Sequence, residues 1–382
     1  MSGNSLQPGN RTAKRIYIFS TLEIVPWGGS EQLWSDAALK LLGGGHKVMT
    51  NTIEWKESPE KLQQIKAAGG ITTFRPNIHT SGRITDKVKN RMKAFSWRNA
   101  ALGFDPDIIL ISEGGAFDNA ILQHGEWLMS LGKPVYIMSQ FLLEYEYMPT
   151  QRRQFFIDYF RRAEKIFFVS NRNRQVAERT MASRMQNAEV IRNPIKIQNT
   201  TGAFPESDIY KIAVVARLEA DIKGYDLLFE TFSQPQWKDR NYRVHVYGSG
   251  PHEEYIKDLA TFYQLEEKII FKGFIKDVKE VWDENHILLL PSRGEGTPLS
   301  LLEANYCKRA AVVTDVGGNA EIVTEGVNGF VAEAAVTSCV ANAMERAWQQ
   351  RDKWEIMGLA AKEKIDTLYA KDAVDDFIEK LI

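Results

Sequence analysis

Two carboxylates lie eight positions apart in the second half of the chain: Glu295 in a glycine-rich loop and Glu303 in the helix predicted after it. Between them, Thr297 and Pro298 favour a helix start, because threonine is a good N-cap and proline suits the first helical position. The N–H groups and dipole at a helix start attract anions such as phosphate. The two carboxylates could hold two sets of hydroxyls on one ligand, such as a hexose and a ribose. The alternative is a loop carboxylate and a solvated helix residue without a shared ligand.

Two cations lie at the turn after another predicted strand, Lys211–Ala216. Arg217 comes directly after this strand and Lys223 directly before a predicted helix. Fixed cations at such a turn suit a pyrophosphate leaving group, because negative charge develops on it as a glycosidic bond breaks. Arginine offers a bidentate fork and lysine a point charge. A purely structural role is less expected, since a helix start favours anions.

A glycine pair, Gly28 and Gly29, follows the first predicted strand. We expect Ser30 to cap the next helix, with Glu31 in its first turn. Glycine permits close approach of the backbone to a ligand, although such pairs are also common in turns for conformational reasons alone.

A second glycine turn, Gly248-Ser249-Gly250, resembles half of a dinucleotide-binding fingerprint. The place of the third glycine is occupied by Glu253, so the motif gives little support to a nicotinamide-dependent oxidoreductase.

The segment around the two glutamates is similar to the signature of the retaining glycosyltransferases of family four. The resemblance rests on Glu295–Leu299, Leu302–Ala304, Gly317-Gly318 and Glu321–Val323. It implies an α/β fold of GT-B architecture, in which two Rossmann-like domains with parallel sheets face each other across a cleft. It also implies a C-terminal helix that crosses back to the N-terminal domain.

The resemblance further implies roles for matching positions. Glu295 would contact the transferred sugar, Glu303 the ribose, and Arg217 with Lys223 the donor diphosphate. Phe274 and Ile275 would seat the base. The other donor-binding positions that it implies are Gly29, Gly248, Gly296, Thr297, Pro298 and Leu299. Thr297 replaces the bulky apolar residue that is more frequent in the family.

The acceptor side departs from the family pattern. Many members carry a histidine after a strand of the N-terminal domain, where this chain has Ser139 and Gln140. Gln140 and Glu113, at the end of the strand in DIILISEGG, are therefore the acceptor-side candidates. His124 lies inside a predicted helix, where we expect a structural role.

We expect no metal or other cofactor. The sequence has no Asp-x-Asp in a loop after a strand and no His, Cys and Asp cluster with metal-ligand spacing. Arg217, Lys223 and a helix dipole would then replace a cation at the diphosphate.

Short β-branched runs alternate with amphipathic stretches, and the apolar runs IAVVA and HILLLP are typical of parallel sheet buried on both faces. The predicted strands are Arg15–Phe19, His46–Thr50, Asp107–Ile111, Pro134–Met138, Lys165–Val169, Glu189–Ile191, Lys211–Ala216, Tyr242–Tyr247, Lys268–Lys272, His286–Leu290, Ala310–Thr314 and Phe330–Ala332. Such alternation predicts doubly wound sheets.

A chain of 382 residues exceeds one ordinary hydrophobic core, so we expect two domains. With a tail before them and helices after them, the chain has four expected parts. They are a tail (1–14), an acceptor domain (15–195), a donor domain (205–350) and C-terminal helices that pack back on the acceptor domain (351–382). The hinge is the Pro-, Asn- and Gly-rich stretch RNPIKIQNTTGAFPESD.

The composition bounds partners and location. With 48 basic and 49 acidic residues, the chain has no global field for nucleic acid. Cys307 and Cys339 are the only cysteines, which excludes a disulfide framework. The N-terminus lacks an apolar signal segment, and we expect a cytoplasmic protein. Basic residues interleaved with Met92, Phe95 and Trp97 in residues 83–98 suggest contact with anionic membrane or a phosphate-bearing acceptor, the alternative being a solvated helix.

We therefore expect a retaining hexosyltransferase of polysaccharide biosynthesis that uses a nucleotide-diphosphate sugar, with a UDP-sugar favoured over a GDP-sugar. The acceptor would be a glycan, a lipid-linked molecule or a small molecule. The resemblance implies front-face attack assisted by the leaving diphosphate. Two alternatives stay open: a nucleotide-sugar epimerase of the same fold and a catalytically silent nucleotide-binding protein.

Overall fold

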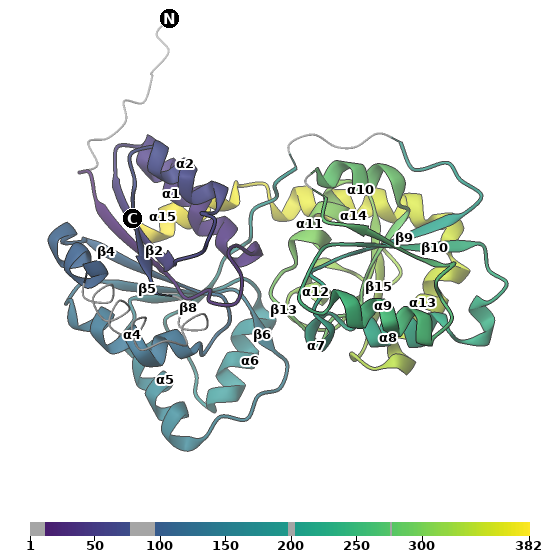
Figure 1. Cartoon of the computed structure of the whole chain (residues 1–382), viewed down its shortest axis with the longest axis horizontal. Coiled ribbons are helices and arrows are strands. Elements are labelled where there is room, and N and C mark those ends of the chain that lie inside the picture. Colours follow the sequence, from purple (N-terminus) through teal and green to yellow (C-terminus); the bar gives the residue numbers. More distant parts are fainter. Residues whose placement is uncertain (1–11, 77–95, 198–202, 276) are drawn as a thin grey trace, which may run out of the picture. The chain divides into compact units, whose positions relative to one another are not determined.

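The computed structural model describes residues 12–76, 96–197, 203–275 and 277–382 (Figure 1). Within these ranges the chain forms two large sheets and one small one. Up to the last strand its helices lie between strands in the sequence, as expected of an α/β protein, and further helices follow that strand.

The first sheet has seven strands, and its inner strands are buried along nearly their whole length. They are β1 (Arg15–Ser20), β2 (Lys47–Ile53), β3 (Ile71–Arg75), β4 (Ile108–Glu113), β5 (Val135–Ser139), β7 (Lys165–Phe168) and β8 (Ala188–Val190). Their order is β3-β2-β1-β4-β5-β7-β8. β1 pairs in parallel with β2 and β4, so the winding direction changes between β1 and β4.

The helices among these strands are α1 (Gln32–Gly43), α2 (Glu60–Ala67), α4 (Asn119–Ser130), α5 (Thr150–Arg162) and α6 (Asn171–Met181). Residues 96–104 are also helical. A short 3-10 turn at Gly29–Glu31 precedes α1, whose N-cap is Glu31. The expectation that Ser30 caps this helix is wrong, because the 3-10 turn moves the helix start beyond it.

The second sheet has six parallel strands. They are β9 (Tyr210–Val215), β10 (Tyr242–Tyr247), β11 (Ile269–Gly273), β12 (Ile287–Leu290), β14 (Ala310–Thr314) and β15 (Gly329–Ala332). Their order is β11-β10-β9-β12-β14-β15, and all neighbouring strands pair in parallel. The helices among and after them are α7 (Ala220–Lys223), α8 (Tyr225–Phe232), α9 (Glu253–Phe262), α10 (Val278–Glu284), α11 (Leu299–Tyr306), α12 (Asn319–Ile322), α13 (Thr337–Gln349), α14 (Trp354–Leu368) and α15 (Ala373–Leu381).

Alternate residues of the second sheet face two different helix layers. Val312 belongs to a core shared with α8, α9 and α13, whereas its neighbours Ala311 and Val313 pack with α10 and α11. Both faces are thus covered, which explains why these strands read as continuous apolar runs.

A two-stranded antiparallel sheet joins distant parts of the chain. β6 (Leu142–Leu143) pairs with β13 (Gly294–Glu295), with Leu142 opposite Glu295 and Leu143 opposite Gly294. Neither short strand was predicted, and neither was β3.

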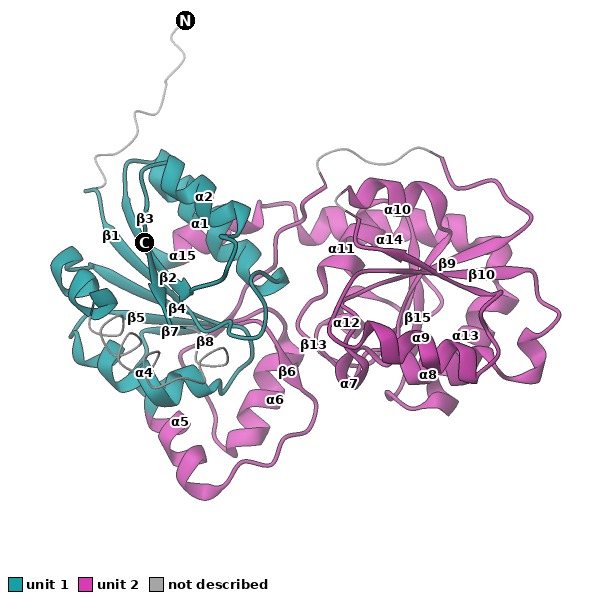
Figure 2. Cartoon of the chain, in the orientation of Figure 1, with its two compact units in different colours: residues 1–138, 159–166, 381–382 teal, residues 139–158, 167–380 magenta. Residues whose placement is uncertain are grey.

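The chain forms two compact units, coloured separately in Figure 2. Unit 1 comprises Met1–Met138, Tyr159–Ile166 and Leu381–Ile382, and unit 2 comprises Ser139–Asp158 and Phe167–Lys380. The second sheet lies wholly in unit 2, together with β6, β8 and α6. These bounds differ from the expected domains 15–195 and 205–350. Part of the expected tail (1–11) and of the hinge (198–202) lies outside the described residues.

The last helix packs on the first sheet, as the resemblance implied. The rings of Phe377 in α15 and Phe167 in β7 meet edge to face, with centroids 5.5 Å apart. Lys380 forms a 2.6 Å ion pair with Glu189 of β8.

The helix before it, α14, belongs instead to the second sheet, so only part of 351–382 packs back. Trp354 and Met357 lie in the core beneath that sheet, and Ile365 lies in the core on its other face. The predicted apolar stripe also contained Ile356 and Leu359, which are 69% and 52% exposed. They fall outside the i, i+3, i+7 face that is buried.

The aromatic residue of the basic segment that the structure describes is buried. Trp97 packs edge to face on His124 and Trp127, which excludes it from a membrane surface. His124 also meets Phe19, and burial lowers its pKa to about 4, in keeping with a structural role. Residues 83–95 lie outside the described residues, so membrane contact through 83–98 stays a prediction.

No helix among the described residues is long and apolar enough to span a bilayer. The cytoplasmic location stays a prediction.

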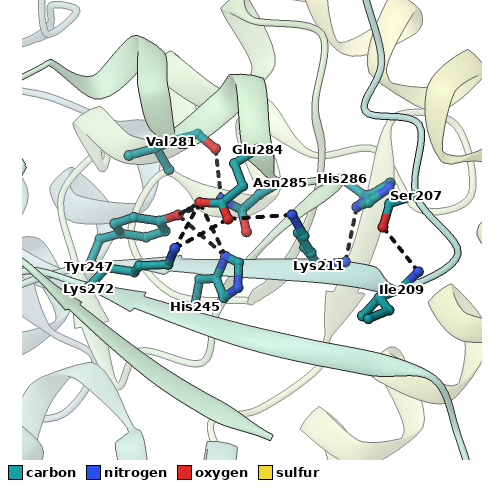
Figure 3. A network of polar contacts seen from close by, with 10 residues as sticks. All are labelled: Ser207, Ile209, Lys211, His245, Tyr247, Lys272, Val281, Glu284, Asn285 and His286. Atoms are coloured by element: carbon teal, nitrogen blue, oxygen red, sulfur yellow. Dashed lines mark hydrogen bonds and ion pairs between the residues drawn. The ribbon is translucent and has the colours of Figure 1, made fainter.

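A polar network fastens α10 to the second sheet (Figure 3). Glu284 accepts a hydrogen bond from the Tyr247 hydroxyl at 3.0 Å and pairs with Lys272 at 3.1 Å and Lys211 at 3.4 Å. His245 lies 3.7 Å from the same carboxylate, and burial lowers the pKa of its ring. Lys272 lies in β11 and Glu284 is the last residue of α10, so the network ties together the strand and the helix that flank the two residues expected at the base.

Candidate functional site

The second sheet changes its winding direction between β9 and β12, which are neighbours in the sheet. Loops that leave the carboxyl ends of two such strands diverge and create a binding site. Arg217 follows β9, and residues 291–298 follow β12. The two loops touch, because the Arg293 N–H donates to the Ile222 carbonyl at 2.7 Å. The two predicted site segments therefore meet in unit 2.

Lys223 and Glu295 form the central ion pair of this site. The Lys223 ammonium donates to Oε1 of Glu295 at 2.7 Å, and their side chains are only 17% and 7% exposed. Lys223 ends α7, and Gly224 stops that helix with a φ of 67°. One hydrogen bond uses one of three ammonium donors and part of the carboxylate's acceptor capacity, so both groups can still bind a ligand.

Arg217 adds a second cation at the same turn. Its guanidinium lies 3.7 Å from the Glu219 carboxylate, a looser pair than that of Lys223. The hydroxyl of buried Tyr225 donates to the carbonyl oxygens of Ala216 and Arg217, both at 3.3 Å. Tyr225 therefore fixes the backbone from which Arg217 extends.

The loop that carries Glu295 is held by residues from the first half of the chain. Asn173, in the first turn of α6, donates from Nδ2 to the Glu295 carbonyl at 3.2 Å. Asn193 donates from Nδ2 to the Thr297 carbonyl at 3.1 Å. Since all of these residues lie in unit 2, the carboxylate is positioned from two sides within one compact unit.

The helix after this loop begins one residue later than expected. Pro298 is the N-cap of α11, which starts at Leu299. The predicted N-cap, Thr297, instead donates from its hydroxyl to the Val169 carbonyl at 2.7 Å. The backbone N–H groups at Leu299 and Ser300 precede the first i→i−4 bonds, and they are the free donors that an anion would use.

Glycine is required at three points of this loop system. A Cβ on Gly296 would overlap the backbone carbonyl of Gln140, and one on Gly318 would overlap the Thr297 hydroxyl. Gly317 has a φ of 52°, and a Cβ there would overlap the Glu295 carbonyl. The chain therefore packs against backbone at Gly296 and Gly317 and against a buried side-chain hydroxyl at Gly318, with no room for a Cβ.

Gly248 packs in the same way on the strand next to Arg217. It has a φ of 136°, and a Cβ would overlap the Ala216 carbonyl. Its N–H donates to the Gly273 carbonyl at 2.9 Å. The glycine turn after β10 thus supports the β9 loop through close backbone packing. This packing explains the glycine at position 248 without a dinucleotide-binding role.

Glu303 lies on α11 and is buried. Burial raises the pKa of its carboxyl group to about 7, and the nearby Lys196 acts in the opposite direction. A buried carboxyl group of this kind suits hydrogen bonds to ligand hydroxyls, whereas the solvated helix residue considered from the sequence is excluded.

Phe274 and Ile275 line an open hollow of about 580 Å³ with Asp277 and Glu280. Phe274 is 76% exposed, so its ring is accessible to a planar ligand. Ile275 is partly buried against the core on this face of the second sheet.

Gln140 lies against residues 291–298, which form the transfer loop. The residue is buried, and its backbone carbonyl oxygen packs against Gly296. Neither polar atom of its side-chain amide has a hydrogen-bond partner among the described residues. An unpaired buried amide is unfavourable unless a ligand or water satisfies it.

Two of the predicted site residues, Gly29 and Glu113, belong to unit 1, whereas the others belong to unit 2. Gly29 starts the 3-10 turn before α1. Glu113 ends β4 and is fully buried, and its burial raises the pKa of its carboxyl well above the usual value, with Asp118 adding to the effect. Asp118 accepts from the Thr21 hydroxyl, and burial raises the pKa of Asp118 to about 6.

The sequence reading missed Asn173 and Asn193, which hold the transfer loop. Both follow predicted strands closely, in VSNRN and VIRNP. The rule that pointed to Arg217, polar residues just after a strand, would also have found them.

Among the described residues, no group of three or more His, Cys, Asp or Glu side chains is placed to hold a metal ion. The expected independence from metal stays a prediction.

Residues 202–364 match the family model described as glycosyl transferases group 1. This range contains Arg217, Lys223, Glu295 and Glu303, and it ends inside α14.

Two curated relatives are similar over shorter stretches. The chain is 26% identical over 185 residues to the poly(ribitol-phosphate) alpha-N-acetylglucosaminyltransferase of Staphylococcus aureus (strain COL), covering 46% of this chain and 37% of that one. It is 30% identical over 118 residues to the N-acetyl-alpha-D-glucosaminyl L-malate synthase of Bacillus anthracis, covering 31% of each. The matches span about a third of the length of these relatives.

Two solved structures share the fold over nearly the whole chain. Anabaena HepE in complex with UDP-glucose has a TM-score of 0.73 at 16% identity, covering 96% of this chain and 98% of that one. The sucrose-phosphate synthase of Thermosynechococcus elongatus has a TM-score of 0.74 at 14% identity, with coverages of 96% and 98%. The fold is the GT-B fold that the sequence predicted.

Proposed function

Since residues 202–364 belong to the group 1 glycosyl transferases, we propose that the chain transfers a sugar from a nucleotide-diphosphate donor to a hydroxyl group of an acceptor. The observation that carries the proposal is the 2.7 Å pair between Lys223 and Glu295 at the point where the second sheet changes direction. In this pair a cation suited to a phosphate lies beside a carboxylate suited to sugar hydroxyls, which supports the proposal.

The cations serve the leaving group. As the bond between the anomeric carbon and the β-phosphate oxygen breaks, its electron pair goes to that oxygen. Arg217, Lys223 and the start of α11 stabilise the charge that develops there. The acceptor oxygen forms the new bond to the anomeric carbon, and its proton passes to the departing diphosphate on the same face. This sequence retains the configuration of the sugar.

The remaining residues bind the donor. Glu295 accepts hydrogen bonds from hydroxyls of the transferred sugar, and Glu303 accepts them from the ribose. Phe274 and Ile275 offer an apolar surface to the base. Gly296 allows the backbone of the transfer loop to approach the donor closely.

We propose a UDP-sugar as the donor. HepE was solved with UDP-glucose, and two related proteins are named for transfer or synthesis of an N-acetylglucosaminyl product. A UDP-hexose or a UDP-N-acetylhexosamine fits these likenesses. The acceptor would be a glycan, a lipid-linked molecule or a small molecule.

Ligand binding tests the nucleotide. Thermal unfolding is followed with UDP, GDP, ADP and dTDP at matched concentrations. A ligand at a hundredfold excess over its Kd stabilises by about 2.7 kcal/mol. Stabilisation by UDP alone supports the proposal, and stabilisation by another nucleotide but not UDP refutes the donor assignment.

Product analysis separates the alternatives. The UDP-sugar that stabilises best is incubated with and without acceptors, and products are separated by mass and by sugar identity. An epimerase converts the donor sugar without acceptor, and a silent nucleotide-binding protein leaves donor and acceptor unchanged. A product in which the sugar is joined to the acceptor with retained configuration supports the transferase.

We propose that transfer proceeds without a divalent metal, because Arg217 and Lys223 supply the positive charge that a metal would bring to a diphosphate. Turnover is measured after exhaustive chelation and again with added Mg²⁺ or Mn²⁺. Equal rates support the proposal. Loss of activity on chelation with rescue by one metal refutes it.

A further inference from the structure

Arg293 and Asp226 form a second ion pair between the two loops of the candidate site. Arg293 lies two residues before Glu295, and Asp226 lies three residues after Lys223. The Arg293 guanidinium donates from Nη1 to Oδ1 of Asp226 at 2.8 Å and from Nη2 to Oδ2 at 2.6 Å. Two parallel hydrogen bonds of this kind fix the direction of approach as well as the distance.

Backbone contacts hold the same two segments together. The Arg293 N–H donates to the Ile222 carbonyl at 2.7 Å. Gly224 packs so closely on Pro291 that a Cβ would lie 2.1 Å from the Pro291 carbonyl oxygen. Residues 222–226 and 291–295 are therefore in direct contact through main chain and side chains, with Lys223 on one segment and Glu295 on the other.

Both members of the second pair are charged at neutral pH. Burial acts to raise the pKa of Asp226, but the hydrogen bond and charge of Arg293, with backbone N–H groups at the start of α8, outweigh burial and hold that pKa below its ordinary value. The hydrogen bond to Asp226 also raises the pKa of the Arg293 guanidinium, and the attraction of Asp221 adds to this effect. The link between the two segments is therefore ionic.

The pair is too exposed to contribute much to overall stability. Its side chains are 34% exposed at Arg293 and 42% exposed at Asp226, and ion pairs near the surface add little to the free energy of unfolding. Its effect on catalysis can be larger, because a misplacement of about 1 Å in a site can cost about a hundredfold in rate. The geometry of the pair is thus better suited to fixing two loops than to stabilising the fold.

We propose that Asp226 and Arg293 are positioning residues for the transfer reaction. They hold Lys223 and Glu295 at the separation at which one donor can place its diphosphate on the cation and its sugar on the carboxylate. The proposal rests on the transferase function proposed above. Asp226 acts through Lys223, so its removal should impair recognition of the diphosphate and leave recognition of the nucleoside unchanged.

The test measures binding of UDP by calorimetry and of uridine by NMR titration. Asp226→Ala removes the carboxylate, Asp226→Glu keeps one, and Asp226→Asn replaces the alanine variant if that variant does not fold. We expect Asp226→Ala to weaken UDP binding about tenfold, or about 1.4 kcal/mol, and to bind uridine as wild type does. Asp226→Glu should bind both ligands as wild type does.

The matched control is Glu345→Ala, on α13 of the same compact unit. Glu345 also accepts two hydrogen bonds from one arginine, since Arg240 donates from Nη1 and Nη2 at 2.8 and 2.9 Å. The control therefore removes a bidentate pair of the same kind away from the two loops. We expect its binding of UDP and of uridine to equal that of wild type.

A double variant tests whether Asp226 acts through Lys223. If it does, Lys223→Met combined with Asp226→Ala binds UDP no more weakly than Lys223→Met alone. Additive losses would show that Asp226 or Arg293 acts on the donor independently of Lys223, and they would overturn the proposal.

Unchanged UDP binding by Asp226→Ala overturns the proposal, and so does a parallel loss of UDP and uridine binding. Equal losses in Asp226→Ala and Glu345→Ala also overturn it, because they show general damage to the unit. A wild type that binds no UDP refutes the donor assignment, and the same comparison with inorganic pyrophosphate then decides the positioning role. A wild type that binds neither ligand overturns both proposals.

Discussion

The Lys223 ammonium and the Glu295 carboxylate lie 2.7 Å apart, although they extend from loops after different strands, β9 and β12. A diphosphate that binds Lys223 competes with Glu295 for the same ammonium protons. Donor binding would therefore loosen this pair and release the carboxylate for sugar hydroxyls. Under the proposed function, recognition of the phosphate and recognition of the sugar would be coupled through this one ion pair.

Replacing either cation should slow transfer without unfolding the protein. We expect Arg217→Ala and Lys223→Ala each to lower turnover about a hundredfold, since each removes a donor aimed at developing charge. The control is Lys257→Ala, which removes a surface pair with Glu253 on α9. Turnover and thermal stability are measured together. Wild-type turnover in either variant contradicts the assignment.

Glu303 should make stability depend on pH. Its folded-state pKa, about 7, lies above the ordinary value of 4.5, so the folded protein holds its proton over a range in which the unfolded chain has lost it. Stability from this group is therefore greatest below about pH 4.5 and falls as pH rises to about 7, by roughly 3 kcal/mol in total. Glu303→Gln cannot ionise and should lack this decline.

The measurement is urea unfolding of wild type and Glu303→Gln at pH 5 and pH 8. We expect the glutamine variant to gain stability relative to wild type at the higher pH. Parallel pH profiles for the two proteins contradict a buried carboxyl at this position.

Gly296→Ala should damage the transfer loop. The added Cβ would overlap the Gln140 backbone carbonyl, which cannot move aside as a flexible side chain would. We expect a loss of about 1–3 kcal/mol in the free energy of unfolding and a loss of transfer. In the control Gly43→Ala, at the end of α1, the added Cβ meets no atom within 4 Å. This variant should raise the free energy of unfolding slightly or leave it unchanged. A Gly296→Ala protein with normal stability and rate contradicts the close packing.

Phe377→Ala should lower the free energy of unfolding by about 3–5 kcal/mol, because it removes a buried ring from the contact with Phe167. Ile356→Ala, at an exposed position of α14, should change it by less than about 0.5 kcal/mol. Both are measured by chemical denaturation. Similar values for the two variants show that α15 adds little to the packing.

Local pattern predicted the sheet strands well, since Tyr242–Tyr247 and Ala310–Thr314 have the observed bounds. β3 was missed because it is only partly buried and lacks a long apolar run. β6 and β13 have two residues each and exist only because distant segments meet. Two residues are too short for an alternating hydrophobic pattern, so neither segment could be predicted as a strand from the sequence.

The polar residue types just after predicted strands pointed to Arg217, Lys223 and Glu295. The ion pair between Lys223 and Glu295 depends on the tertiary structure, which local sequence does not reveal. Asn173 was missed because it binds the backbone of Glu295, 122 positions away. Thr297 was assigned as an N-cap from its residue type, whereas its hydroxyl finds the Val169 carbonyl instead. In both cases the role of the side chain is set by a partner far away in the sequence, which residue type and local pattern do not identify.

The contact between Phe167 and Phe377 also bears on how the protein is made. The two rings are about 200 residues apart, which at 5–20 residues per second corresponds to roughly 10–40 s of translation. During that time a nascent chain on the ribosome has β7 without its final covering helix. A premature stop codon after the second sheet would leave Phe167 uncovered permanently. Such a product should be recognised by chaperones and proteases, although every residue of the transfer loop had been synthesised.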